Sequence, residues 1–100
     1  MGSQFVPASG RSADDIRADL EARGLDLRSW SNGPGDTYGW HDHSYHKTLV
    51  CLDGSIVFHT DDGDVNLAAG DVLELEPGTR HAATVGPNGV RCAEGQVREP

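Results

Sequence analysis

The chain has 100 residues, 36% of them hydrophobic, and a formal net charge of −8 at pH 7, a composition that suits one small folded domain and argues against disorder. Its acidic pI near 4.8 would repel nucleic-acid backbones and anionic membrane surfaces, so neither is expected as a partner. No apolar stretch approaches the roughly 20 residues that a membrane span requires, and the first residues lack the apolar segment of a signal peptide, so a cytoplasmic location is expected.

The first residues of the chain are expected to form a flexible arm. Residues 1–11 are polar in character, contain Pro7 and Gly10, and show no apolar periodicity. Residues 12–100 are expected to form one folded domain, because a chain of this length supports a single hydrophobic core.

The segment Ser12–Arg23 is predicted to be the one short helix. Ser12 is a favourable N-cap, and Ile16 and Leu20 lie on one side at helical spacing. Gly24 follows at the position where a glycine commonly ends a helix. We expect this helix to pack against the outside of a sheet.

After Gly24 the apolar pattern changes to the spacing of strands. Residues 25–30 alternate and predict a short strand, and residues 31–39 are rich in Gly, Pro, Asn and Asp, which predicts a loop. Short runs of Val, Leu and Ile then alternate with turn signals, which is typical of an all-β sandwich or barrel. The turn signals are Asp53-Gly54, Asp61-Asp62-Gly63, Ala69-Gly70-Asp71, Glu76-Pro77-Gly78 and Gly86-Pro87-Asn88-Gly89.

Asp53-Gly54 between two apolar runs predicts a β-hairpin with a two-residue turn. Such a turn would pair Cys51 with Ile56 and Leu49 with Phe58. One face of the hairpin would then carry His41, His43, Tyr45, Lys47, Leu49, Cys51, Ile56 and Phe58. The other face would carry His46, Val50, Val57 and His59.

The valines of this second face need a cover, which the helix, a second sheet or a partner subunit can provide. We expect a homodimer, because the valines and the N-terminal arm suit packing or strand exchange between subunits. Cys51 and Cys92 are expected to be buried free thiols rather than a disulfide, with a pocket thiol or a redox pair as the alternatives.

Histidines are concentrated just before the first apolar run, at His41, His43 and His46, and His81 follows later. Because side chains two residues apart share a face of an extended strand, His41 and His43 can approach the same point. Neutral imidazoles are common ligands of transition metals, so the pattern indicates a metal site. His46 would point to the other face, and only a bulge would make it a replacement ligand.

Two motifs give this pattern a more specific interpretation. Gly39-Trp40-His41-Asp42-His43, followed by Gly54, resembles the first motif of the cupin superfamily. The segment Gly70–His81, with Gly70-Asp71, then Gly78 and His81, resembles the second motif. The resemblance covers roughly residues 39–85 and implies a small jelly-roll β-barrel with a metal inside it.

Carried over from the resemblance, His41, His43 and His81 would hold one divalent transition metal: Zn, Ni, Mn or Fe. The family's usual fourth ligand is a glutamate four residues after the second histidine, but this chain has Lys47 there. A lysine ammonium has no lone pair and cannot ligate a metal. A three-histidine site would leave positions open for water or substrate.

Lys47 would then orient an anionic ligand or act as a catalytic acid or base, with Tyr45 and Cys51 as further substrate-binding residues on the same face. The alternative for Lys47 is an ion pair with Glu74 or Glu94, or a side chain that reaches solvent. The resemblance therefore implies a metal-binding protein that binds or transforms a small, anionic organic molecule. Two alternatives stay open: a non-catalytic binding or sensor module, and a barrel without metal.

Overall fold

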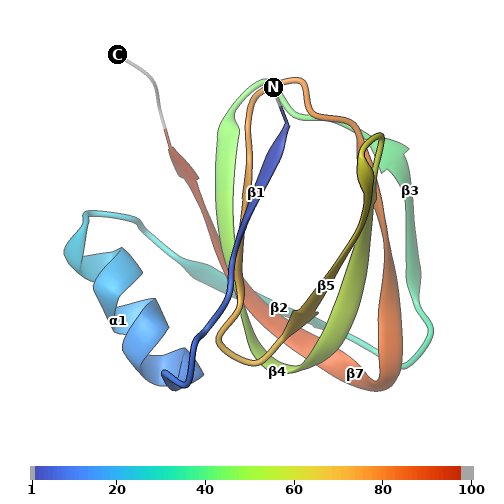
Figure 1. Cartoon of the computed structure of the whole chain (residues 1–100). Helices are drawn as coiled ribbons and strands as arrows, with labels where there is room; N and C mark the ends of the chain where they lie inside the picture. Colours follow the sequence, from blue (N-terminus) through green and yellow to red (C-terminus); the bar gives the residue numbers. More distant parts are fainter. Residues whose placement is uncertain (1, 98–100) are drawn as a thin grey trace.

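The alternating apolar runs form strands, and the capped segment before them forms the only helix within the part of the chain that the structure describes, residues 2–97. The structure is a computed structural model (Figure 1). The elements in chain order are β1 (Ser3–Val6), α1 (Ala13–Ala22), β2 (Arg28–Asn32), β3 (Thr37–His41), β4 (His46–Thr60), β5 (Gly63–Ala68), β6 (Val72–Leu75) and β7 (His81–Val97).

Helix α1 begins and ends where its capping residues predict. The Ser12 hydroxyl accepts a hydrogen bond from the backbone N–H of Asp15 at 3.1 Å. Gly24 adopts a φ of 95°, and its N–H donates to the carbonyl of Glu21 at 2.9 Å. The predicted short helix is therefore confirmed. Within residues 2–97, no helix has the length and apolar character needed to cross a membrane.

The seven strands of the described residues belong to one antiparallel sheet, ordered β1-β6-β4-β7-β2, with β5 beside β4 and β3 beside β7. Strands β4 and β7 have 15 and 17 residues and pair with each other along their length. The first part of β4 has β6 as its other neighbour, whereas the last part has β5. The sheet therefore has two halves, which face each other in Figure 1 and share β4 and β7.

Two groups of apolar side chains hold this arrangement together. The main core lies on the inner side of the sheet and contains Leu49, Cys51, Ile56, Phe58, Leu67, Leu73, Leu75, Ala83, Val85, Val90 and Cys92. The second group lies between α1 and the outer side of the sheet and contains Leu20, Leu27, Val50, Leu52, Val72 and Ala93. Burial of both groups from water is the main favourable contribution to folding.

Helix α1 covers Val50, one of the two outer valines. Val50 is 0% exposed and belongs to the same cluster as Leu20 of the helix. The prediction that the helix packs outside the sheet is confirmed (Figure 1). At Val50 the argument for a subunit contact therefore no longer holds, and the homodimer stays a prediction.

The predicted hairpin at Asp53-Gly54 is wrong. Strand β4 continues through these residues, and Asp53 and Gly54 lie opposite Arg91 and Val90 of β7. Cys51 pairs with Cys92 rather than Ile56. The Asp-Gly pair forms a corner instead of a reversal, because the pairing with β7 shifts on both sides of it.

The assignment of side chains to faces nevertheless holds across this corner. Leu49 and Cys51 before it, and Ile56 and Phe58 after it, all lie in the main core. In a regular strand, Cys51 and Ile56 would point to opposite faces because they are five positions apart, which is an odd number. The irregular corner shifts the alternation by one residue, as the predicted two-residue turn would have done.

The N-terminal segment also differs from the prediction. Ser3–Val6 pair with β6 as strand β1, at the edge of the sheet, so part of the expected arm has regular structure. The two apolar residues of this segment, Phe5 and Val6, are adjacent and give no alternating strand pattern, so the pairing with β6 supplies what the sequence signal lacks. Met1 and residues 98–100, which the predicted ranges include, lie outside the described residues.

The two strands after the helix are displaced from their predicted positions. The predicted strand at 25–30 is β2, Arg28–Asn32, and the predicted loop at 31–39 contains the start of β3 at Thr37. Both strands are mostly exposed, and both pair with β7. The positions of these two strands therefore depend on pairing with residues far away in the sequence. Periodicity within each strand does not reveal such pairing.

The corner in β4 should tolerate only glycine. Gly54 has a φ of 77°, and a Cβ there would overlap the carbonyl oxygen of Gly89 on β7. Gly35 has a similar φ of 74° but open space around it. We expect Gly35→Ala to lower the free energy of unfolding by about 1 kcal/mol and Gly54→Ala to lower it by about 2–5 kcal/mol, since overpacking adds to the backbone strain.

Chemical denaturation of both variants measures the two losses. Because the backbone strain is matched, the difference between them isolates the contact with Gly89. Equal losses would show that the close approach of β4 and β7 does not constrain this position.

Candidate metal centre

Pairing between strands brings three histidines together. His41 ends β3 and lies directly opposite His81, which begins β7. His43 follows in the short connection to β4. The ring centroids of His41 and His81 are 4.3 Å apart, and that of His43 lies 4.9 Å and 5.2 Å from them. One ring nitrogen of each histidine lies within 4.8 Å of the others.

Backbone hydrogen bonds fix the orientation of two of these rings. His41 Nδ1 lies 2.7 Å from the Gly39 carbonyl, and His81 Nδ1 lies 2.9 Å from the Thr79 carbonyl. A carbonyl oxygen only accepts, so Nδ1 carries the hydrogen and donates it in both rings. In the neutral ring, Nε2 then keeps a lone pair, which is the state that a metal ligand requires.

The other ring nitrogens lack protein partners. Nε2 of His43 and Nε2 of His81 are buried and have no hydrogen-bond partner among residues 2–97. Leaving a buried polar atom unpaired costs about 1–3 kcal/mol, so such atoms are rare and require an explanation. A metal ion shared by the three rings would supply the missing partner, and the residues present therefore fit a metal.

The electrostatic surroundings favour neutral imidazoles. Burial lowers the pKa of His43, and its nearness to the Lys47 ammonium and to the imidazoles of His41 and His81 lowers it further. Burial also lowers the pKa of His81, although its bond to the Thr79 carbonyl opposes this effect. Rings that stay neutral at pH 7 can bind a metal without first losing a proton.

Beside the histidines lies a cavity of about 210 Å³. At roughly 30 Å³ per water molecule in the liquid, it has room for on the order of seven waters, or for a small organic molecule. Aromatic side chains and two charged groups share its wall with the histidines. The lining residues are Trp30, Tyr38, His41, Lys47, Phe58, His81, Ala83 and Glu94.

Lys47 points into this cavity with a side chain that is 11% exposed. Its Nζ lies 3.3 Å from Oε1 of Glu94, and Trp30 Nε1 donates to the same oxygen at 2.7 Å. Of the two predicted ion-pair partners, Glu94 is therefore the one in contact. Glu74 instead lies 3.0 Å from Nε2 of His46.

Tyr45 and Cys51, the other predicted substrate-binding residues, do not line the cavity. Tyr45 stacks on the ring of His43, with centroids 4.9 Å apart and an interplanar angle of 28°. Cys51 is 0% exposed in the main core, with its Sγ 3.7 Å from the carbonyl oxygens of Asp53 and Gly54. The structure therefore places both residues outside the lining of this cavity, because a shared face does not give the depth of a side chain. Cys51 and Cys92 are buried free thiols, as predicted.

Trp30, Tyr38 and Glu94 were not identified from the sequence as members of the site. Trp30 and Tyr38 reach it because β2 and β3 pair with β7, where Trp30 lies opposite Cys92 and Tyr38 opposite Ala83. Glu94 is two residues from the core residue Cys92, so alternation along β7 was a usable signal for it.

Acidification should destabilise the metal-free protein through the histidine cluster. The folded protein holds the pKa of His43 and His81 below 6.5, the ordinary value. As the pH falls through 6.5, the unfolded chain takes up protons that the folded protein refuses, so the free energy of unfolding decreases. This stability is fully present above pH 6.5.

Urea unfolding between pH 7.5 and pH 5 measures the effect. A variant with both His43→Gln and His81→Gln should lose less stability over the same interval, because the groups responsible are absent. A wild-type free energy of unfolding that stays constant or rises on acidification would contradict this account.

The family model for the cupin domain matches residues 30–88, a span that contains all three histidines. A search of curated proteins found no match. Similar folds occur among solved structures. A chain from the crystal structures of the DMSP lyases RdDddP and RnDddQII aligns with a TM-score of 0.68 and 24% identity, covering 74% of this chain. This chain spans only 38% of that protein.

Two further structures match at low identity. A DUF861 family protein from Thermotoga maritima aligns over 95% of this chain and 99% of its own length, with a TM-score of 0.66 and 14% identity. A cupin-2 domain protein from Shewanella frigidimarina aligns over 72% and 69%, with a TM-score of 0.63 and 15% identity. These likenesses support the fold, and the match over residues 30–88 shows the family: the chain belongs to the cupin domain family.

Proposed function

We propose that this cupin binds one divalent transition metal through His41, His43 and His81, inside a jelly-roll barrel formed by the two halves of its sheet. The observation that carries the proposal is the pair of buried, unpartnered Nε2 atoms on His43 and His81 within one three-histidine cluster. Zn, Ni, Mn and Fe all accept imidazole ligands. When bound, such a metal supplies Lewis-acid chemistry to a molecule beside it.

We infer that the cavity beside the histidines binds a small organic anion. Lys47 is the cation of the cavity wall, and its ammonium has three donors, so it can hold both Glu94 and a ligand carboxylate. The rings of Trp30, Tyr38 and Phe58 give an apolar surface for the rest of the molecule and displace water. The volume of about 210 Å³ suits a small organic molecule.

Two roles for Lys47 follow from the same contacts. As an anion-binding group it positions the ligand beside the histidines, and as an acid or base it would move a proton at the bound molecule through Nζ. Its contact with Glu94, at 3.3 Å, favours the first role, because the ammonium already has a carboxylate partner. A binding or sensor module is therefore the second candidate function. One structural neighbour is a DMSP lyase, but the likeness at 24% identity does not carry its substrate to this chain.

Metal binding is expected at one ion per chain. Untagged protein, stripped with a chelator and then exposed to Zn²⁺ or Ni²⁺, should retain one ion after dialysis, measured by inductively coupled plasma mass spectrometry. His43→Ala and His81→Ala should each weaken the affinity by more than about a hundredfold, since loss of a ligand costs at least as much as loss of its supporting contacts.

His46→Ala is the matched control. It removes a neighbouring histidine that contacts Glu74 instead of the cluster, so its metal content should equal that of the wild type. Wild-type protein that retains no metal, or an equal loss in all variants, would overturn the proposal.

Anion binding should depend on Lys47. Metal-loaded protein can be titrated calorimetrically with a panel of small mono- and dicarboxylates. For any acid that binds, Lys47→Met should weaken the affinity by about tenfold or more, the usual contribution of a charge-assisted hydrogen bond. Glu94→Gln should leave the affinity unchanged or increase it, because it removes the carboxylate that competes for the ammonium.

Metal content and circular dichroism of both variants serve as controls for folding. If a carboxylate binds equally well to Lys47→Met, Lys47 is not the anion site. If no member of the panel binds to the metal-loaded wild type, the cavity does not select small carboxylates.

A further inference from the structure

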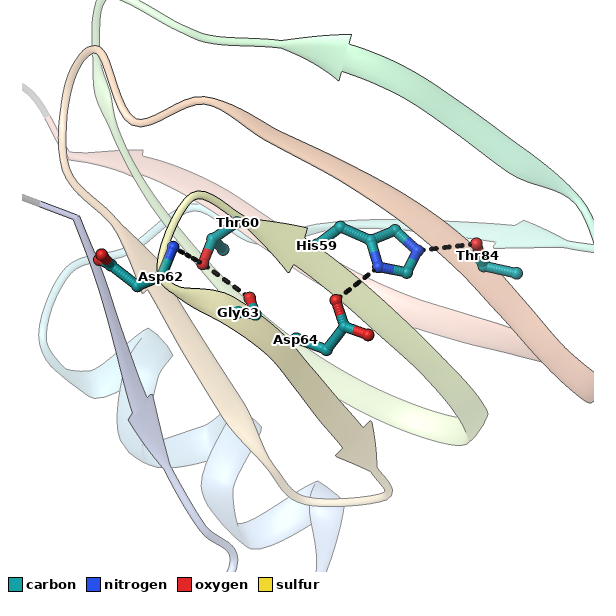
Figure 2. Close-up of polar contacts among 6 residues, drawn as sticks. All are labelled: His59, Thr60, Asp62, Gly63, Asp64 and Thr84. Carbon is teal, nitrogen blue, oxygen red and sulfur yellow. Dashed lines mark hydrogen bonds and ion pairs between the residues drawn. The ribbon is translucent and has the colours of Figure 1, made fainter.

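A second cluster of reactive side chains lies on the outer face of the sheet, away from the histidine cluster. His59 on β4 stands between Asp64 on β5 and Thr84 on β7, as Figure 2 shows. Phe58 and Ala83, their neighbours in the chain, line the cavity, so alternation directs His59 and Thr84 outward. The side chains of His59 and Asp64 are 31% and 60% exposed, so small molecules can reach them from solvent.

The hydrogen bonds of this cluster have a defined direction. Asp64 Oδ1 lies 2.7 Å from Nδ1 of His59, and Thr84 Oγ1 lies 2.9 Å from Nε2 (Figure 2). An ionised carboxylate only accepts, so Nδ1 carries the hydrogen. In the neutral ring, Nε2 then holds the lone pair, and the Thr84 hydroxyl must donate to it. The hydroxyl proton therefore points at a base whose orientation Asp64 fixes.

A second histidine on the outside of the sheet also contacts a carboxylate, but the neighbouring hydroxyl does not donate to its ring. His46 Nε2 contacts Glu74 Oε1 at 3.0 Å, and the Thr48 hydroxyl contacts that same oxygen at 3.5 Å. There the hydroxyl is directed to the carboxylate and not to the imidazole. Of the two histidine–carboxylate pairs found within residues 2–97, only His59 with Asp64 has a hydroxyl on its other ring nitrogen.

We propose that Thr84 is a nucleophile that accepts an acyl group from a small activated ester or thioester. Thr84 Oγ1 would form a bond to the acyl carbon as the bond from that carbon to the leaving group breaks. The hydroxyl proton passes to Nε2 of His59 and then to the leaving oxygen or sulfur, so the products are O-acylated Thr84 and a free alcohol or thiol. Asp64 acts as a positioning residue, since it holds the ring in the required tautomer.

The test uses full-length, metal-free protein and p-nitrophenyl acetate as the acyl donor, with release of p-nitrophenol and intact mass followed together. One acetyl group should appear on Thr84, located by peptide mapping. Thr84→Val should abolish that adduct, and Thr84→Ser should retain it. His59→Gln should slow its formation by about a hundredfold, the lower end of the usual contribution of a general base.

The role of Asp64 needs a measurement that distinguishes positioning of the His59 ring from a general contribution to stability. Asp64→Asn should slow acetylation of Thr84, and Asp64→Glu should restore part of the rate because it returns a carboxylate acceptor for Nδ1. Circular dichroism and thermal unfolding of all variants check the fold. An effect of equal size in Asp64→Asn and Asp64→Glu would remove Asp64 from the proposal.

The chain is well suited to this experiment. Lys47 is its only lysine, so background acetylation on amines is limited to that residue and the N-terminus, and mapping separates both from Thr84. His46→Ala, which removes the other exterior histidine–carboxylate pair, should leave the rate unchanged. Absence of acetyl groups on Thr84, or an unchanged rate in His59→Gln, would overturn the proposal.

Discussion

The antiparallel pairing of β4 with β7 along their full lengths is the constraint on which the other features depend. It joins the two halves of the sheet and brings Lys47 and Phe58 of one strand to the same cavity as His81 and Glu94 of the other. A slip of one residue in this pairing would turn every one of these side chains to the opposite face. On the outer face, the same register places His59 beside Thr84. Both clusters therefore depend on one set of backbone hydrogen bonds.

The corner at Gly54 explains why the predicted hairpin, although wrong, assigned the side chains of β4 to the correct faces of the sheet. The sequence signal for a tight turn at Asp53-Gly54 is real, because the backbone there adopts a φ of 77°. What periodicity could not supply was the partner: β7 runs alongside the corner and keeps the chain from reversing. Side-chain alternation is a local property and survived the error, whereas strand pairing depends on residues far away in the sequence.

The same distinction separates the parts of the site that the sequence reveals from those that it does not. His41, His43 and His81 could be identified because short-range spacing and two motifs point to them. Trp30 and Tyr38 could not, since they reach the cavity only through the pairing of β2 and β3 with β7. Alternation also predicted the face of Cys51, but its side chain is 0% exposed in the main core and lies outside the lining of the cavity. The face of the sheet to which a side chain points is therefore predictable from the local sequence, whereas the depth at which that side chain is buried is not.

The charges around the histidines determine what kind of ligand the site favours. Lys47 stands where the family pattern has a carboxylate ligand, so the three neutral imidazoles would leave the charge of a divalent cation uncompensated. Lys47 and Glu94 are in contact at 3.3 Å and nearly cancel each other's charge. A partly buried positive charge attracts a nearby anion more strongly than the same charge does in bulk water, because the effective dielectric constant is lower. The presence of lysine where the family pattern has glutamate supports the proposed small anion, because the protein then provides no carboxylate ligand to a divalent cation held by His41, His43 and His81.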